Sequence, residues 1–159
     1  MNEIAYLNGL NVFQTVKNAL DNIGWHYDAN EQELRISLGV DGDDIPMDFD
    51  ISIDSEKEII NLYSHMPFEL NDEKQLELSL ATNFINNQLI DGSFDYSPKD
   101  KVLLFRMSCC YVDSLLSTKV IDYMLDFSCF ATDKYNDKLA KLNQGSITLQ
   151  QCIEECLKR

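Results

Sequence analysis

Two cysteines near the C-terminus have a spacing that could support chemistry. Cys152 and Cys156 lie four residues apart in a segment with helical periodicity, and two thiolates one helical turn apart could supply two of the four ligands of a zinc ion. Leu149, Ile153 and Leu157 share that side of the helix, however, and a buried cysteine behaves as a small hydrophobic residue. We therefore expect core thiols here and no bound metal.

The other candidates for catalysis or metal binding are isolated in the sequence. Cys109 and Cys110 are adjacent on a predicted strand, so their side chains point to opposite faces. His26 and His65 each lie near a strand end without a paired histidine. The acidic segment 41–44 lacks the residue order of a calcium loop. With no phosphate-binding glycine motif or nucleophile elbow either, the sequence predicts a non-enzymatic protein without a cofactor.

Charge narrows the classes of partner. The 159 residues include 13 basic and 27 acidic side chains, which gives a net charge of −14. Phosphates repel so acidic a chain, which excludes nucleic acids and anionic membrane surfaces as partners. Residues 1–66 contain 3 basic and 13 acidic side chains, so −10 of the −14 falls there. That half is either a solvated sheet surface with charge-protected edges or a docking surface for a basic segment.

Targeting signals are absent from the sequence. The N-terminus has neither a basic segment nor an apolar one of the kind that signal peptides contain. The longest apolar run, residues 102–105, is far shorter than the roughly 18 residues of a membrane span. Five cysteines without a disulfide framework fit a reducing compartment. We expect a cytoplasmic protein.

The first half of the chain predicts one helix and three strands. Apolar residues recur at helical spacing from residue 8 to 23, and Gly24 provides a left-handed stop. Residues 33–39 and 45–54 alternate between apolar and polar, and a third strand fits residues 58–66. Such alternation indicates a sheet with one face in water.

The second half predicts three helices and a hairpin. These elements are a helix from Asn71 or Asp72 to about residue 90, strands at 93–97 and 101–112 around the turn Pro98-Lys99-Asp100, a long helix from about 114 to Gly145, and a short helix capped by Thr148 with Gln151. The first of these helices has its apolar stripe at Leu76, Leu80, Phe84, Ile85 and Leu89. The order is αβββαββαα, and we expect one domain over residues 1–159.

A spaced set of residues in the second half forms a recognisable pattern. Two asparagines end a helix, a glycine and an aromatic residue open a strand, and an arginine lies late in the next one, here at Asn83, Asn86, Gly92, Phe94 and Arg106. With these residues the chain resembles the YbjN family, and segments 20–25 and 133–135 are similar to family positions as well. Members of this family are loosely described as sensory-transduction regulators. The resemblance implies an α+β, type III secretion chaperone-like fold, with a core at residues 8–145 and an extra C-terminal helix at 146–159.

The residues that carry the resemblance have structural interpretations. Gly24 and Gly92 would end helices at positive φ, where a side chain is strained. Asn83 and Asn86 would bond to backbone groups of the adjoining turn. In these roles the residues would stabilise the fold and would not take part in catalysis.

One face of the predicted five-stranded sheet combines charge with apolar side chains. Arg106 would pair across this face with Asp48 or Asp50 of the second strand. An apolar island beside these groups would consist of Val102, Leu104, Cys110 and Val112, with Ile59 and Tyr63 of the third strand next to them. Either the C-terminal helix or a second copy of the chain should cover the island, and we favour a homodimer.

These observations favour a protein-binding module with a regulatory or chaperone-like role. One alternative is a dedicated secretion chaperone that holds an extended segment of one client. Another is a small-ligand sensor or an unrecognised enzyme.

Overall fold

The computed structural model describes residues 3–97 and 99–158. The elements are α1 (Glu3–Ile23), β1 (Asp28–Asn30), β2 (Arg35–Val40), β3 (Met47–Asp54), β4 (Ile59–His65), the short 3₁₀ turn η1 (Asp72–Lys74), α2 (Gln75–Asn86), β5 (Ser93–Ser97), β6 (Val102–Cys110), α3 (Thr118–Gln144) and α4 (Leu149–Cys156). Among the described residues, no helix is both long enough and apolar enough to span a bilayer. The predicted turn residue Pro98 lies outside the described residues.

Six strands form one antiparallel sheet in the order β1-β2-β3-β4-β6-β5. The expected count of five was wrong because β1 was missed. That strand is Asp28-Ala29-Asn30, which is fully exposed and has no apolar alternation. Its antiparallel pairing with β2, rather than any pattern in its own sequence, makes this segment a strand. The first helix also begins at Glu3, five residues before the predicted start.

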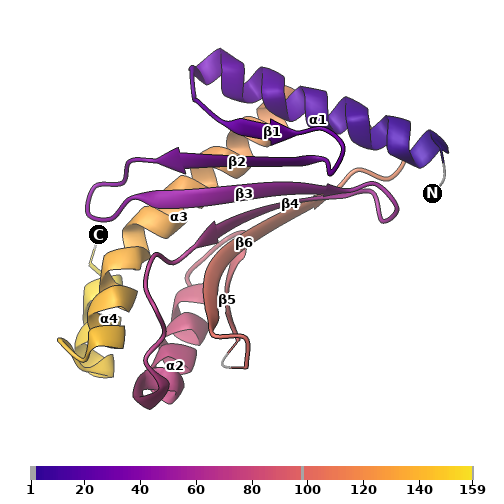
Figure 1. The fold of residues 1–159 in the computed structure, drawn as a ribbon. Coiled ribbons are helices and arrows are strands. Elements are labelled where there is room, and N and C mark those ends of the chain that lie inside the picture. Colours follow the sequence, from indigo (N-terminus) through magenta and orange to yellow (C-terminus); the bar gives the residue numbers. More distant parts are fainter. Residues whose placement is uncertain (1–2, 98, 159) are drawn as a thin grey trace.

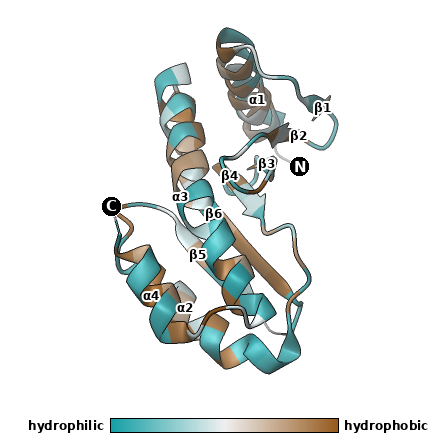
Figure 2. Ribbon diagram, turned by 90° about the vertical axis from the view of Figure 1, so that its left-hand side faces the viewer, coloured by the Kyte–Doolittle hydropathy of each residue, from teal (hydrophilic) through white to brown (hydrophobic). Residues whose placement is uncertain are grey.

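The helices lie on one side of this sheet (Figure 1). The inner face of the sheet contacts α1 at β3, α2 at β5, and α3 at β3, β4 and β6. In the side view, α3 and α4 lie together on one side of the strands (Figure 2). Alternate residues of β3, such as Phe49 and Ile51, are buried against these helices. Burial of each large apolar side chain contributes roughly 1.5–3 kcal/mol to the stability of the fold, and this contribution holds the sheet and the helices together.

Helix α3 buries the whole stripe that its periodicity predicts: Ile121, Met124, Leu125, Ser128, Tyr135, Leu139 and Leu142. It ends, as predicted, at Gly145, which has a φ of 75° and lies in the left-handed region. Helix α4 then starts with the predicted capping box, in which Thr148 and Gln151 each bond to the other's backbone N–H.

The predicted stripe of α2 was wrong in part. Leu76 is 72% exposed and Leu80 is also exposed, whereas Leu78, Ala81 and Ile85 are buried. Apolar residues surround most of this helix, so periodicity alone allowed two stripes. The side that packs on β5 and α4 decided between them.

Gly92 has a different role from the predicted one. Helix α2 ends at Asn86, so Gly92 leads into β5 instead of closing a helix. Its φ is 63°, and a Cβ atom there would clash with the Phe105 ring. Gly24 does close α1, with a φ of 74°, and a Cβ atom there would meet open space. Both glycines are strained sites for other residues, but only Gly92 is also crowded.

Substitution of these two glycines separates backbone strain from crowding. Gly24→Ala should cost roughly 1–2 kcal/mol of unfolding free energy, the penalty of a left-handed alanine. Gly92→Ala should cost roughly 1–3 kcal/mol more, because Phe105 must move. Urea unfolding of both variants measures the difference. Equal losses would show that Phe105 yields without cost.

The side chain of Asn86 holds the start of β5 in place. Its amide Nδ2 donates to the Phe94 carbonyl at 3.0 Å, and its Oδ1 accepts from the Phe94 N–H at 2.7 Å. One side chain therefore takes the place of a strand partner. The predicted bonds to backbone groups of the adjoining turn were wrong for both asparagines: Asn86 bonds to the backbone of β5, and the Asn83 Oδ1 accepts from the side-chain amide of Asn87 at 3.5 Å.

The two cysteines of α4 are core residues, as the sequence predicts. Cys152 and Cys156 are buried in the layer between α4 and its neighbours α2 and α3. This placement also means that α4 packs among the helices and leaves the other side of the sheet uncovered.

Thiol reactivity should follow burial. With Ellman's reagent, the exposed Cys110 should react first. Cys129 should react slowly, because burial raises the pKa of its thiol to about 12. Cys152 and Cys156 should react only after unfolding. A Cys110→Ser control assigns the fast phase, and fast modification of Cys152 in the native protein would contradict its core position.

Candidate protein-interaction face

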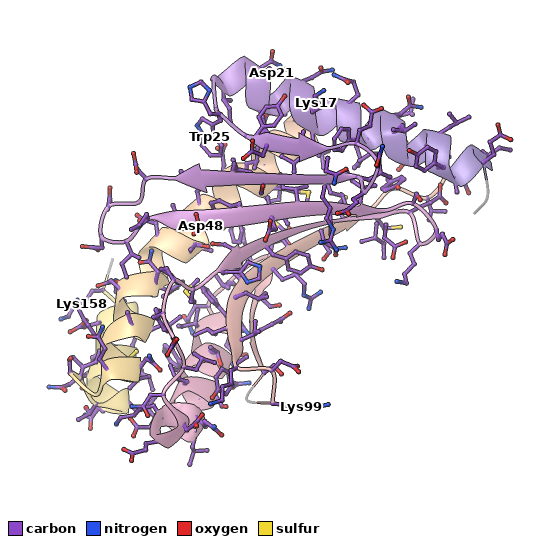
Figure 3. The ribbon with its side chains drawn as sticks, in the orientation of Figure 1. Lys17, Asp21, Trp25, Asp48, Lys99 and Lys158 are labelled. Carbon is purple, nitrogen blue, oxygen red and sulfur yellow. The ribbon has the colours of Figure 1, made fainter. Side chains whose placement is uncertain are left out.

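The side of the sheet away from the helices, called here the open face, presents every second residue of each strand. Asp48 lies on it, between the buried residues Met47 and Phe49 (Figure 3). The other open-face residues of the four central strands are exposed or half-buried: Arg35, Ser37, Gly39, Asp50, Ser52, Asp54, Ile59, Asn61, Tyr63, His65, Val102, Leu104, Arg106, Ser108 and Cys110.

The strand register decides which of the predicted residues meet. Asp50 lies opposite Tyr63, and Tyr63 lies opposite Arg106. In the next row, Asp48 lies opposite His65, and His65 opposite Leu104. The central part of the face is therefore a band across β3, β4 and β6 in which acidic, aromatic, basic and apolar side chains are direct neighbours.

The predicted apolar island is divided in the structure. Tyr63 and Leu104 are diagonal neighbours across the pairing of β4 with β6. Ile59 and Cys110 form a second pair of predicted island residues at one end of the β4–β6 pairing, and Val102 pairs with Ser97 beyond its other end. Antiparallel pairing sends the first residue of β4 to the last residue of β6, so the island is split between the two ends and the centre of the pairing.

A shallow depression of about 310 Å³ lies at the centre of the face. It is lined by Arg35, Asp50, Ile51, Ser52, Tyr63, His65 and Leu104. Leu104 and Tyr63 contribute apolar surface, while the other side of the depression is polar. This arrangement suits an apolar side chain of a partner with a polar group beside it.

Four of the lining residues were not predicted as site residues: Arg35, Ile51, Ser52 and His65. His65 was expected to be an isolated structural histidine, but its Nε2 lies 3.4 Å from the Asp50 carboxylate on the open face. Arg35 had no predicted role. The alternation of β2 and β4 already puts both on the same side as Asp50, which is the signal that could have identified them.

The predicted partner of Arg106 was wrong. Its Nε donates to the Asp95 carboxylate at 2.6 Å, and this bond raises the pKa of the guanidinium. Asp48 and Asp50 are two strands away, because β4 lies between β3 and β6. The alternation in the sequence showed which face each residue occupies but not the order of the strands. Asp95 of β5 is the carboxylate that the hairpin brings nearest.

A double-mutant cycle tests this assignment. Arg106→Gln and Asp95→Asn should couple by about 0.2–1 kcal/mol, a modest value because both side chains are more than a third exposed. The matched cycle of Arg106→Gln with Asp50→Asn should give a coupling near zero. Unfolding free energies from urea titrations supply both values. A larger coupling to Asp50 would restore the original prediction.

Metal chemistry has no evident site in the part of the chain that the structure describes. No group of three or more His, Cys, Asp or Glu side chains is placed there to hold an ion. The pair Cys152 and Cys156 has no third ligand of this kind among these residues.

Comparison with known proteins places the chain in a family. The sequence profile of YbjN, described as "Putative bacterial sensory transduction regulator", matches residues 13–141. The chain belongs to the YbjN family. This confirms the resemblance seen in the sequence. Among curated proteins, no sequence is significantly similar to this YbjN-family chain.

Two solved structures share the fold of this YbjN-family protein. A chain of the ExsC–ExsE complex is 13% identical, with a TM-score of 0.60 over 80% of this chain and 92% of that one. YbjN from E. coli is 12% identical, with a TM-score of 0.56 over 79% of this chain and 91% of that one. These likenesses confirm the predicted α+β, type III secretion chaperone-like fold, with six strands in place of five.

Proposed function

We propose that the open face binds a protein partner and that the protein acts without catalysis, in a regulatory or chaperone-like role. The observation that carries this proposal is the depression at Tyr63 and Leu104, which lies on a sheet face that no helix of the described residues covers. Apolar side chains exposed on one side of a layered fold are typical of interaction sites.

The charge of the face favours a particular kind of partner. Asp28, Asp48 and Asp50 are exposed on the β1–β3 half, which lies within residues 1–66, the part of the chain that carries −10 of the net charge of −14. The cations nearest the centre are Arg106, which Asp95 neutralises, and Arg35. A partner with basic side chains over β3 and an apolar side chain in the depression complements this pattern.

The comparisons support a role of this kind. The family is described in terms of sensory transduction, and one fold neighbour was solved as a complex of two proteins. That complex also favours a second candidate, a dedicated secretion chaperone for one client. The uncovered face would then hold an extended client segment. All five cysteines are free thiols, which supports placement in the reducing cytoplasm.

Site-specific photocrosslinking in cells tests the face directly. Benzoylphenylalanine in place of Tyr63 should crosslink to a partner on illumination. The matched control replaces Tyr123, an exposed tyrosine of α3 on the helix side, and should give no such product. Crosslinks at Tyr123 with none at Tyr63 would contradict the proposal. One discrete product indicates a single client, as the secretion-chaperone candidate requires.

We also propose a second copy of the chain as one partner of the open face. A twofold contact needs only one self-complementary patch, but each copy contributes a charge of −14, so repulsion opposes pairing at low salt. Light scattering should show twice the 18.3 kDa chain mass, with tighter association as salt rises. Leu104→Lys should return the protein to a monomer, and Leu76→Lys on α2 should not. A monomer at all salt concentrations would contradict the dimer and leave binding of another protein intact.

A further inference from the structure

An aspartate is followed directly by a glycine at two places in the chain, Asp41-Gly42 and Asp91-Gly92. In such a step the backbone nitrogen of the glycine can attack the side-chain carboxyl carbon of the aspartate, because glycine has no side chain to hinder the approach. The product is a five-membered succinimide ring. Its hydrolysis can reconnect the chain through the side-chain carbon, which gives isoaspartate. The rate depends on how the fold holds the two groups relative to each other.

The fold holds the Asp91 carboxyl group against the amide of Gly92. The Gly92 N–H donates to the Asp91 Oδ1 at 2.8 Å, so the nitrogen and the carboxyl carbon that would join are already neighbours. The Tyr123 hydroxyl donates to the other oxygen, Oδ2, at 3.2 Å and holds the carboxyl group in this orientation. Groups that are held in contact lose little further entropy when they react.

The backbone at this step is accessible and is not tied into a ladder. Helix α2 ends at Asn86 and β5 begins at Ser93, so the step lies in the connection between them, and Asp91 is exposed to water. Among the backbone bonds of the described residues, none uses the Gly92 N–H. The attacking nitrogen is therefore bound only to the carboxyl group that it would attack.

The Asp41-Gly42 step is held in a different way. Its glycine is packed against other groups, since a Cβ atom there would clash with the Ile45 carbonyl and the Asp133 carboxylate. The next N–H, that of Asp43, donates to Asp133 at 2.8 Å. Ring closure requires the backbone to turn, and a loop that is packed and bonded against α3 resists this. The two steps share one sequence but differ in their surroundings.

We propose that Asp91-Gly92 is a site of spontaneous isoaspartate formation in the folded protein. The Gly92 nitrogen forms a bond to the Asp91 Cγ and gives its proton to solvent, and one carboxyl oxygen leaves as water. A second water then opens the ring. Attack on the main-chain carbonyl carbon of Asp91 gives isoaspartate, and attack on Cγ restores aspartate. Water is released once and taken up once, so the chain keeps its mass, and no group is oxidised or reduced.

The modification lengthens the backbone between α2 and β5 by one atom. This connection has little room for it, because the two bonds from Asn86 to Phe94 close the loop and Gly92 is crowded by the Phe105 ring. The start of β5 should therefore loosen. Since β5 is an edge strand of the sheet, the change would affect the β5 edge before it reached the central strands.

Peptide mapping of protein incubated at neutral pH tests the proposal. The peptide that contains Asp91 should develop a second chromatographic peak of unchanged mass, which accepts a methyl group from protein isoaspartyl methyltransferase. The peptide with Asp41 should stay unmodified. In guanidinium chloride, where the fold is lost, both steps should react at similar rates. As much isoaspartate at Asp41 as at Asp91 in the folded protein, or none at Asp91, would overturn the proposal.

Two variants separate the chemistry from the positioning. Asp91→Glu should abolish the product, because the longer side chain must close a less favourable six-membered ring. Tyr123→Phe should slow it, because the carboxyl group is no longer held. The matched control is Tyr27→Phe, which removes a hydroxyl that donates to Asp21, and it should leave the rate unchanged. Equal rates in the Tyr123→Phe and Tyr27→Phe proteins would overturn the positioning role of Tyr123.

The melting temperature of aged protein gives an independent readout. It should fall as isoaspartate accumulates in the wild-type chain, whereas Asp91→Glu should melt at the same temperature before and after incubation. A constant melting temperature in modified wild-type protein would overturn the predicted loosening of β5. None of these measurements depends on the open face or on a partner, so their failure would leave the proposed function standing.

Discussion

The packing of α3 against the inner face of the sheet is the contact on which the rest of the structure depends. The apolar stripe of α3 covers β3, β4 and β6, and polar residues of α3 form hydrogen bonds with neighbouring loops. Asp133 accepts the Asp43 N–H at 2.8 Å, while Asn143 accepts the Asn71 N–H and donates to the Glu69 carbonyl. The loop before β3 and the segment before α2 are therefore both held in place by α3. Because α3 and its neighbours occupy only one side of the sheet, the open face is left to other molecules.

The sequence predicted the structure best where its pattern of apolar and capping residues allowed a single arrangement. The stripe of α3, the alternation of β3 and the caps at Gly145 and Thr148 all give single solutions, and the structure has each of them. Alternation also placed Tyr63, Leu104 and Arg106 on a common face. The family resemblance then ordered these elements into a known arrangement.

Other features depended on information that local pattern does not contain. Leu76 and Leu78 were equally acceptable core residues until the neighbours of α2 chose between them. Arg106 was assigned to the wrong carboxylates because strand order is a long-range property. A cleft between α1 and the loop after β6 is lined by Asn8, Glu58 and Tyr111, which come from segments about 50 residues apart in the chain. Only the assembled fold brings them together.

The pairing of β4 with β6 has a further consequence for the order of assembly. It joins residues 39 to 51 positions apart, whereas β3 and β4 are joined by a tight turn, so closing the β4–β6 pairing carries the larger entropic cost. The depression on the open face is lined by Arg35 and Asp50 of β2 and β3 and by Leu104 of β6. It therefore forms only after β6 has paired with β4. A molecule bound there would favour the β4–β6 pairing by mass action, so occupancy would lengthen the lifetime of the folded chain.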